Sequence, residues 1–446
     1  MNKRLFLFIL FIFFANFLLA QEKESIKPEV KEQSVASDKV SQDDKIKTEE
    51  TPENKETVTE TKSATPFKFG ATVGSEIING TSYMSIGMQP EIILGKFGAG
   101  LDVVFRFDSS FKLYEPDWDD WKDIIAKINY IRWGVKRDPV FIKIGLLDDV
   151  YLGHGSIFYR FSNKLFLPEI RRIGVQFDLD LKSFGWELFD DDIIDNRIFG
   201  GRLYFRPFHK SKSFFLKKIA FGITGAADID LPKPSLSKEV VLAGADIDLP
   251  VFEIKDIFQL ILFTDFVKNF HFQGMKGSGL IPGFYFELFG FRFNGEYHIY
   301  QPCFNGPWFD SFYDLERANK LLYVSSFSNS RTGWSIRMNR DLFTWVFFAF
   351  DFSAEGDNNP SMHFEVVLLK KILDKLQAGL SYDKKNIDSF SDTFKIEDVD
   401  AKLSAFVVYS VSPNVDLKLQ YERAFVIENN TVKPVVNFGL NTSIHF

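Results

Sequence analysis

The sequence predicts an all-β protein, a transmembrane antiparallel up-and-down β-barrel of about 18–20 strands. Three observations lead to this prediction. Apolar and polar side chains alternate along many short segments, and the connections between these segments are alternately long and short. The chain also begins with a segment typical of exported proteins.

Residues 1–20 are predicted to be a secretory signal peptide. Lys3 and Arg4 precede an apolar core, Leu5–Leu19, that is broken only by Asn16, and the small residue Ala20 follows it. A spanning helix needs about 20 apolar residues, so we favour cleavage over retention as an anchor. The next residue is not cysteine, and a lipoprotein anchor is therefore not expected.

The composition then changes twice. Residues 21–66 contain no aromatic residue and are rich in charge, so they are predicted to form a disordered periplasmic linker. A plain spacer is favoured over a docking arm for a partner. Residues 67–446 contain all seven tryptophans and most of the 52 phenylalanines, and they are predicted to form the barrel.

The alternation has the period of a β-strand, in which successive side chains point to opposite faces. From Phe97 to Phe107 every second residue is apolar, and the positions between them include Asp102 and Arg106. Residues 173–182, 291–299 and 415–422 repeat the pattern. A soluble sandwich also alternates. Export, the aromatic face and strands of about 9–11 residues favour a closed barrel whose apolar face meets lipid.

The connections add a second argument. Short turns such as Gly95–Lys96 and Phe289–Gly290 separate longer gaps. The longer gaps fall near 108–128, 147–170, 229–237, 268–279, 301–331, 354–360 and 385–396. Transmembrane barrels show this asymmetry, with short periplasmic turns and longer outer loops. An even strand number would place both termini in the periplasm.

Three of these loops are long enough to fold inward: 108–128, 147–170 and 301–331. The first has an amphipathic spacing that predicts a short helix, formed by Trp118, Trp121, Ile124 and Ile125. Such a helix would plug the mouth or lie at the membrane interface. For each loop taken singly, an ordinary surface loop is favoured over an inward fold.

The carboxyl-terminal run resembles the terminal signal of Gram-negative outer-membrane proteins. Phe438, Leu440, Ile444 and Phe446 occupy alternate positions and end the chain with phenylalanine. The resemblance implies recognition by the barrel-assembly machinery and residence in the cell outer membrane. Residues 151–155, Asn163, Pro168 and 171–174 also resemble a segment of bacterial outer-membrane proteins, a likeness that implies location and no activity.

If apolar positions face lipid, the positions between them line the interior. The candidate pore-lining residues are Asp102, Arg106, Arg132, Lys136, Lys143, Asp178, Asp180, Arg202, Arg206, Arg292 and Glu296. Fixed charges in a wide barrel select solutes by sign. Arg132, Lys136 and Lys143 are predicted to form a basic ladder on adjacent strands. The alternative is that lining charges pair with neighbouring carboxylates and stiffen the wall.

Signatures of chemistry are few. The net charge of −7 argues against a nucleic-acid binder, and Cys303 is the single cysteine. The six histidines show no HExxH-type spacing, and neither a GxSxG elbow nor a P-loop occurs. We therefore expect no enzyme, no cofactor and no metal, although a catalytic site built from distant strands would leave no local pattern.

These observations predict a porin-like channel for passive diffusion of small hydrophilic solutes. The alternative is a surface adhesin or docking barrel with a plugged lumen, which binds a macromolecule through its outer loops. Expected partners are outer-membrane lipid, the assembly machinery, the solutes and possible further copies of the chain, and no nucleic acid.

Overall fold

A computed structural model describes residues 67–446 apart from 79–80, 137, 168–169, 255–256, 271–275, 343–344, 357, 374, 429–430 and 446. The predicted signal peptide and linker lie outside the described residues, and so does Phe446. Among the described residues, no helix is both long and apolar enough to cross a lipid bilayer.

The chain folds into one antiparallel sheet whose strands follow one another in chain order. The first strands are β1 (Phe67–Ile78), β2 (Thr81–Leu94), β3 (Phe97–Leu101), β4 (Val103–Phe107), β5 (Ile128–Trp133), β6 (Val140–Gly145), β7 (Gly174–Asp180), β8 (Phe184–Asp190), β9 (Ile198–Phe205) and β10 (Ala220–Asp228). They are followed by β11 (Val240–Ile254), β12 (Phe258–Asn269), β13 (Ser278–Leu288), β14 (Phe291–Tyr300), β15 (Arg331–Leu342), β16 (Val346–Glu355), β17 (Asn358–Leu373), β18 (Leu376–Lys384), β19 (Ala401–Ser412), β20 (Val415–Glu428) and β21 (Thr431–His445).

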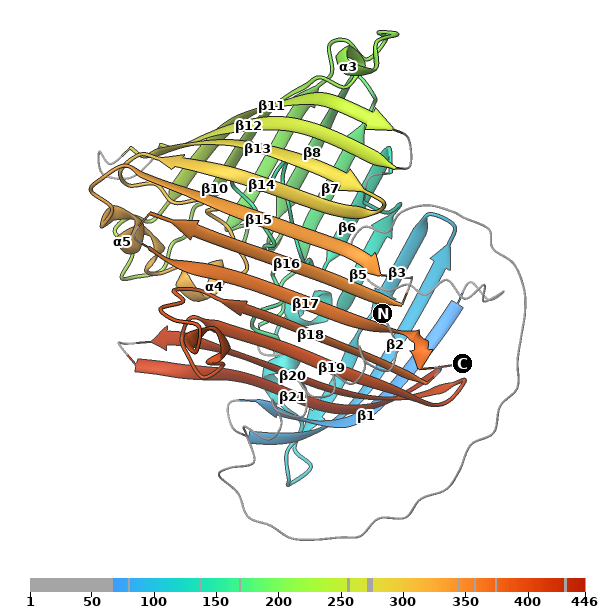
Figure 1. The fold of residues 1–446 in the computed structure, drawn as a ribbon. Helices are drawn as coiled ribbons and strands as arrows, with labels where there is room; N and C mark the ends of the chain where they lie inside the picture. Colours follow the sequence, from blue (N-terminus) through green and yellow to red (C-terminus); the bar gives the residue numbers. More distant parts are fainter. Residues whose placement is uncertain are drawn as a thin grey trace. The chain divides into compact units, whose positions relative to one another are not determined.

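The sheet closes on itself because β1 pairs with β21 as well as with β2, as Figure 1 shows. β3 and β4 both pair with β2, on either side of Asp102, so they are two halves of one strand that is interrupted there. Counted in this way, the barrel has 20 strands. This confirms the predicted fold class at the upper strand count. Closure excludes the sandwich alternative, since every edge is paired.

The two faces of the wall have opposite character. On β14, Tyr297 points outward with 49% of its surface exposed, whereas its neighbours Glu296 and His298 are buried inside. Leu280 and Phe284 on β13 are exposed in the same way. An apolar outer face over a polar interior is the pattern of a barrel in lipid, as the alternation predicted.

The connections sort by end. The start of β1 and the end of β21 lie at the same end of the barrel, since Gly70 pairs with His445. We call this end the terminal rim and the opposite end the loop rim. Most connections at the terminal rim are short, such as Phe289–Gly290, where both residues have positive φ as a tight hairpin turn requires.

Two connections depart from the expectation. Residues 354–360 do not form a long loop, because β16 and β17 are joined at the loop rim by residues 356–357 alone. Residues 206–219 form a long connection at the terminal rim, which the sequence patterns did not indicate. This segment includes α3 (Phe214–Lys217).

The predicted helix in the first long loop is confirmed as α2 (Trp121–Ile125), which follows the short helix η2 (Glu115–Asp117). Trp118 stacks on Phe105 with ring centroids 4.6 Å apart. Because Phe105 belongs to the outward positions of β4, this contact lies on the outer surface. The remaining helices, α4 (Tyr313–Glu316), α5 (Lys320–Ser325) and η3 (Asp392–Phe394), belong to loops at the loop rim.

Candidate functional site: the barrel interior

The connection between β6 and β7, residues 146–173, enters the barrel instead of lying on its surface. Its core residues Val150, Ile157, Phe158 and Phe161 are almost fully buried. They pack with residues of β8 to β14, including Phe189 and Val267, in one apolar cluster. We call residues 146–173 the inward loop.

A second long connection joins this cluster. Residues 301–330, between β14 and β15, contribute the fully buried Phe304, Trp308 and Phe309. Phe158 and Phe309 form a parallel β-bridge, and Tyr159 donates its backbone N–H to the carbonyl of Phe309. The two loops are therefore one packed unit inside the barrel. For these two of the three loops the expectation of an ordinary surface loop was wrong, and the alternative of an inward fold holds.

His154 anchors the inward loop to the wall. Its Nδ1 lies 2.7 Å from Asp265 of β12, and its Nε2 lies 2.7 Å from Asp248 of β11. Burial opposes a charge on the ring, but the two carboxylates outweigh it and raise the pKa of His154 to about 10. His154 is therefore a protonated imidazolium that donates from both nitrogens.

Further polar contacts tie the loop to the opposite wall. Arg160 donates to Asp383 of β18 at 2.8 Å, and the Tyr159 hydroxyl donates to Asp351 of β16 at 2.5 Å. Nearer the end of the loop, Arg171 donates to Asp102 at 2.8 Å. The inward loop therefore crosses the lumen, since it contacts β11, β12, β16, β18 and Asp102 between β3 and β4.

The second loop has its own anchors. Arg317 forms a bidentate pair with Asp228 of β10, and the hydroxyl of Tyr313 donates to the same carboxylate. Arg172 of the inward loop donates to Asp314 at 2.5 Å. The buried Asp228 carboxylate is therefore both paired and hydrogen-bonded, which is the condition under which a buried charge is tolerated.

Beside the inward loop, charged groups remain accessible to water. Asp148 exposes 56% of its side chain and lies 3.2 Å from the ammonium of Lys164. Although burial opposes it, Lys164 and Lys402 lower the pKa of Asp148 to about 2. Glu422 of β20 is also exposed, on an inward position, and interacts with Lys402 and Lys418. We call Asp148, Lys164, Lys402, Lys418 and Glu422 the lysine–carboxylate cluster.

The predicted lining residues fall into three groups. Six take part in ion pairs: Asp102 with Arg171, Arg106 with Glu76, Asp180 with Arg206, Arg202 with Asp246, and Glu296 with Arg337. The pairing alternative therefore holds for these six side chains. Asp178 lies on β7 opposite Glu187, and Arg292 lies on β14 opposite Glu287.

The basic ladder forms in part. Arg132 and Lys143 are direct partners in the β5–β6 register, so they stand side by side on one face. Lys136 is not on a strand. It lies in the turn after β5, where its ammonium is 5.6 Å from the centroid of the Tyr151 ring. β5 ends at Trp133, three residues before Lys136, so this position lies beyond the predicted strand.

The proposed assembly signal lies on β21, the closing strand. Leu440 and Ile444 are exposed on its outer face, whereas Phe438 is half-buried.

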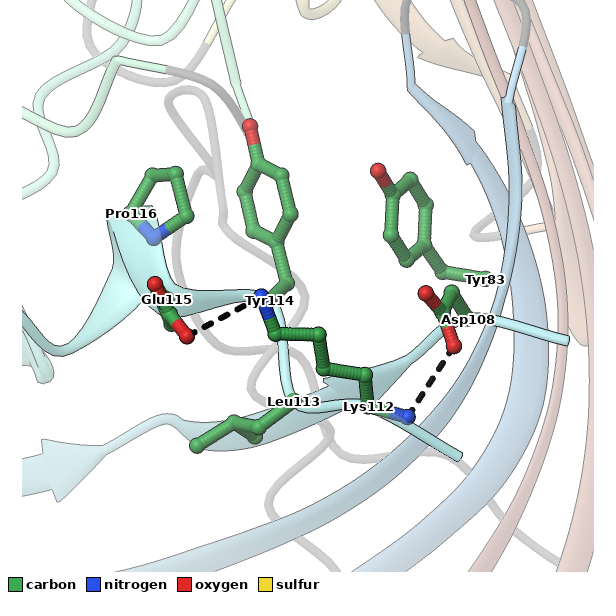
Figure 2. Close-up of a pocket in the computed structure, with 7 residues that line it drawn as sticks. All are labelled: Tyr83, Asp108, Lys112, Leu113, Tyr114, Glu115 and Pro116. Carbon is green, nitrogen blue, oxygen red and sulfur yellow. Dashed lines mark hydrogen bonds and ion pairs between the residues drawn. The ribbon is translucent and has the colours of Figure 1, made fainter. Parts of the chain in front are cut away.

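A small pocket of about 200 Å³ lies at the loop rim near the end of β4, and Figure 2 shows its lining. Tyr83 and Tyr114 face each other at 5.0 Å between ring centroids. The Lys112 side chain pairs with Glu115, and the backbone N–H of Lys112 donates to the carboxylate of Asp108. The charged side chains of Lys112 and Glu115 therefore engage each other.

No protein-family model matches the chain, and no curated protein matches it. Solved structures with some likeness are Pseudomonas aeruginosa outer-membrane proteins. OpdK is 7% identical at a TM-score of 0.34, covering 85% of this chain and 97% of that one. OccK5 (OpdH) is 11% identical at 0.33, covering 85% and 96%. At identities and TM-scores this low, these structures do not indicate a solute for this chain.

Proposed function

We propose that the protein is an outer-membrane channel for passive diffusion of small hydrophilic solutes. The single observation that supports this most strongly is the accessible lysine–carboxylate cluster inside a barrel whose outer face is apolar. Glu422 and Asp148 are exposed in the interior, and water that reaches them stabilises their charge in addition to the neighbouring lysines. A barrel of 20 strands is wide enough to hold water, and a diffusion channel requires a water-filled interior.

In this proposal the solute passes between the inward loop and the wall formed by β18 to β21 and β1 to β5. The inward loop limits the size of the solute, because its anchors on both walls fix it across the lumen. The residues predicted to line the pore then act in two ways: charges in ion pairs hold the wall and the loop in place, and basic side chains on the passage side, such as Arg132, add positive potential.

The proposal is a transport role without catalysis, and it needs no cofactor. Cleavage after Ala20, a linker over 21–66, assembly through the β21 signal and association with further copies of the chain remain predictions. Each is consistent with a channel, since exported barrels need a signal peptide and an assembly step.

Liposome swelling tests the proposal. Purified, folded protein is reconstituted in liposomes, which are then diluted into isosmotic solutions of a pentose, a disaccharide and a tetrasaccharide. We expect swelling rates that fall steeply with solute size, because the inward loop narrows the lumen. A folded barrel that gives no swelling with any solute would overturn the channel proposal and would favour the docking barrel instead.

A further inference from the structure

The long connection at the terminal rim, residues 206–219, differs from the other connections there. Between β9 and β10 it carries Arg206, Lys210, Lys212, Lys217 and Lys218 and no acidic residue. Arg206 is paired with Asp180, and Lys218 is hydrogen-bonded to Glu253 of β11. Lys210 and Lys212 are exposed, and the described residues place no carboxylate within ion-pair distance of either.

Apolar side chains of the same segment are exposed beside these lysines. Phe208, Phe215 and Leu216 expose 48%, 43% and 39% of their surfaces. They follow the end of β9 and precede β10, where the exposed rings of Phe205 and Phe221 stack with centroids 5.5 Å apart. Figure 1 shows α3 standing beyond the ends of the strands.

Aromatic and aliphatic side chains mixed with lysines are typical of segments that lie at a membrane surface. The apolar groups enter the headgroup boundary, and the lysine stems lie along it while their ammonium groups reach the phosphates. Other connections at the terminal rim, such as Gly95–Lys96 and Phe289–Gly290, are too short to present such a surface.

From this juxtaposition of Lys210 and Lys212 with the outer apolar face, we propose that residues 206–219 bind anionic phospholipid headgroups of the periplasmic leaflet. The occupant follows from two features. The unopposed positive charge is complementary to phosphate, and the exposed apolar groups are continuous with the surface that meets lipid chains. This inference rests on the membrane location in the proposed function and is independent of conduction.

Native mass spectrometry of the full barrel, titrated with cardiolipin or with phosphatidylcholine, tests the proposal. Wild-type protein should bind cardiolipin more tightly than phosphatidylcholine. K210Q/K212Q should lose affinity for cardiolipin by about fivefold for each lysine, since a lysine near an anionic surface contributes about 1 kcal/mol. K210R/K212R should keep most of the affinity.

A matched control comes from the other end of β10. Lys233 and Lys238 are exposed in the connection between β10 and β11 at the loop rim. K233Q/K238Q removes the same charge and should leave cardiolipin binding unchanged. Equal binding of the two lipids by wild type, or equal loss in both glutamine variants, would overturn the proposal.

The two proposals fail separately. K210Q/K212Q should conduct as wild type does, because neither lysine belongs to the proposed passage. A wild-type barrel that conducts but binds the two lipids equally contradicts only the lipid site, whereas a wild-type barrel that prefers cardiolipin but does not conduct contradicts only the channel.

Discussion

Phe158 and Phe309 stack inside the barrel with their ring centroids 4.4 Å apart, although eight strands separate their two loops along the sequence. Both side chains are fully buried. The contact joins the inward loop to residues 301–330, so the constriction proposed above depends on two loops that support each other.

Replacing Phe158 with alanine should loosen the two loops while the strands persist. Truncation of a buried phenylalanine costs about 3–5 kcal/mol, and the strand ladder does not depend on this ring. Hydrogen exchange of the loop peptides measures the effect. Phe390→Ala, at a side chain that is 83% exposed, is the matched control and should change nothing. Unchanged protection of residues 147–161 in the Phe158 variant would contradict the packing described here.

His154 should hold the inward loop at physiological pH and release it in alkali. Its pKa in the folded protein, about 10, lies above the ordinary value of 6.5. The stabilisation from its charge is therefore complete below about pH 6.5 and is lost as the pH rises through about 10. Protease susceptibility of the inward loop, measured from pH 5 to pH 11, should rise near pH 10.

The matched variant for this prediction is His154→Gln, which cannot carry the charge. Its inward loop should be susceptible across the whole range without the step that distinguishes wild type. A wild-type transition near pH 6.5 would show that the two carboxylates do not hold the proton on His154.

Replacing Arg132 and Lys143 with glutamate should shift ion selectivity towards cations. The two side chains are neighbours in the β5–β6 register, so the double change reverses the sign of a local cluster. The reversal potential of reconstituted protein in a salt gradient reports the shift. Lys238→Glu, in an outer connection away from the proposed passage, should give a smaller change. An unchanged reversal potential in the double variant would remove Arg132 and Lys143 from the lining.

Removing the carboxylate of Asp383 should leave Arg160 without its main partner. A buried ion pair that loses one member is destabilised by about 3–5 kcal/mol, because the remaining charge stays buried. We expect Asp383→Asn to increase current noise in single-channel recordings, as the loop moves more freely across the lumen. The exposed pair of Lys112 with Glu115 offers a comparison, since Glu115→Gln should leave the current quiet.

The sequence predicted the barrel because each strand carries its own evidence. The alternation from Phe97 to Phe107, or from Phe291 to Ile299, reports two environments within ten residues or so, and neighbouring strands need no further information to pair in order. The alternation of long and short connections then predicted which end of the barrel carries the long loops. Lys136 and residues 354–360 were misplaced because turn boundaries are set by local hydrogen bonds that period-two patterns do not record.

The interior could not be predicted in the same way. His154 lies 94 residues from Asp248 and 111 from Asp265, so no local spacing connects them. One signal was present: the two inward segments are rich in aromatic residues such as Phe158, Phe161 and Trp308, which an exposed loop would rarely carry in such number. This signal indicated that the two segments are buried, but it did not indicate which residues they pack against.

Single-channel recording of the purified protein in a planar bilayer tests the channel account most directly. The account predicts stable, stepwise conductance, with a larger step in Phe158→Ala because the loops that narrow the lumen are loosened. A correctly folded barrel that inserts and stays silent, in wild type and in this variant alike, would contradict it.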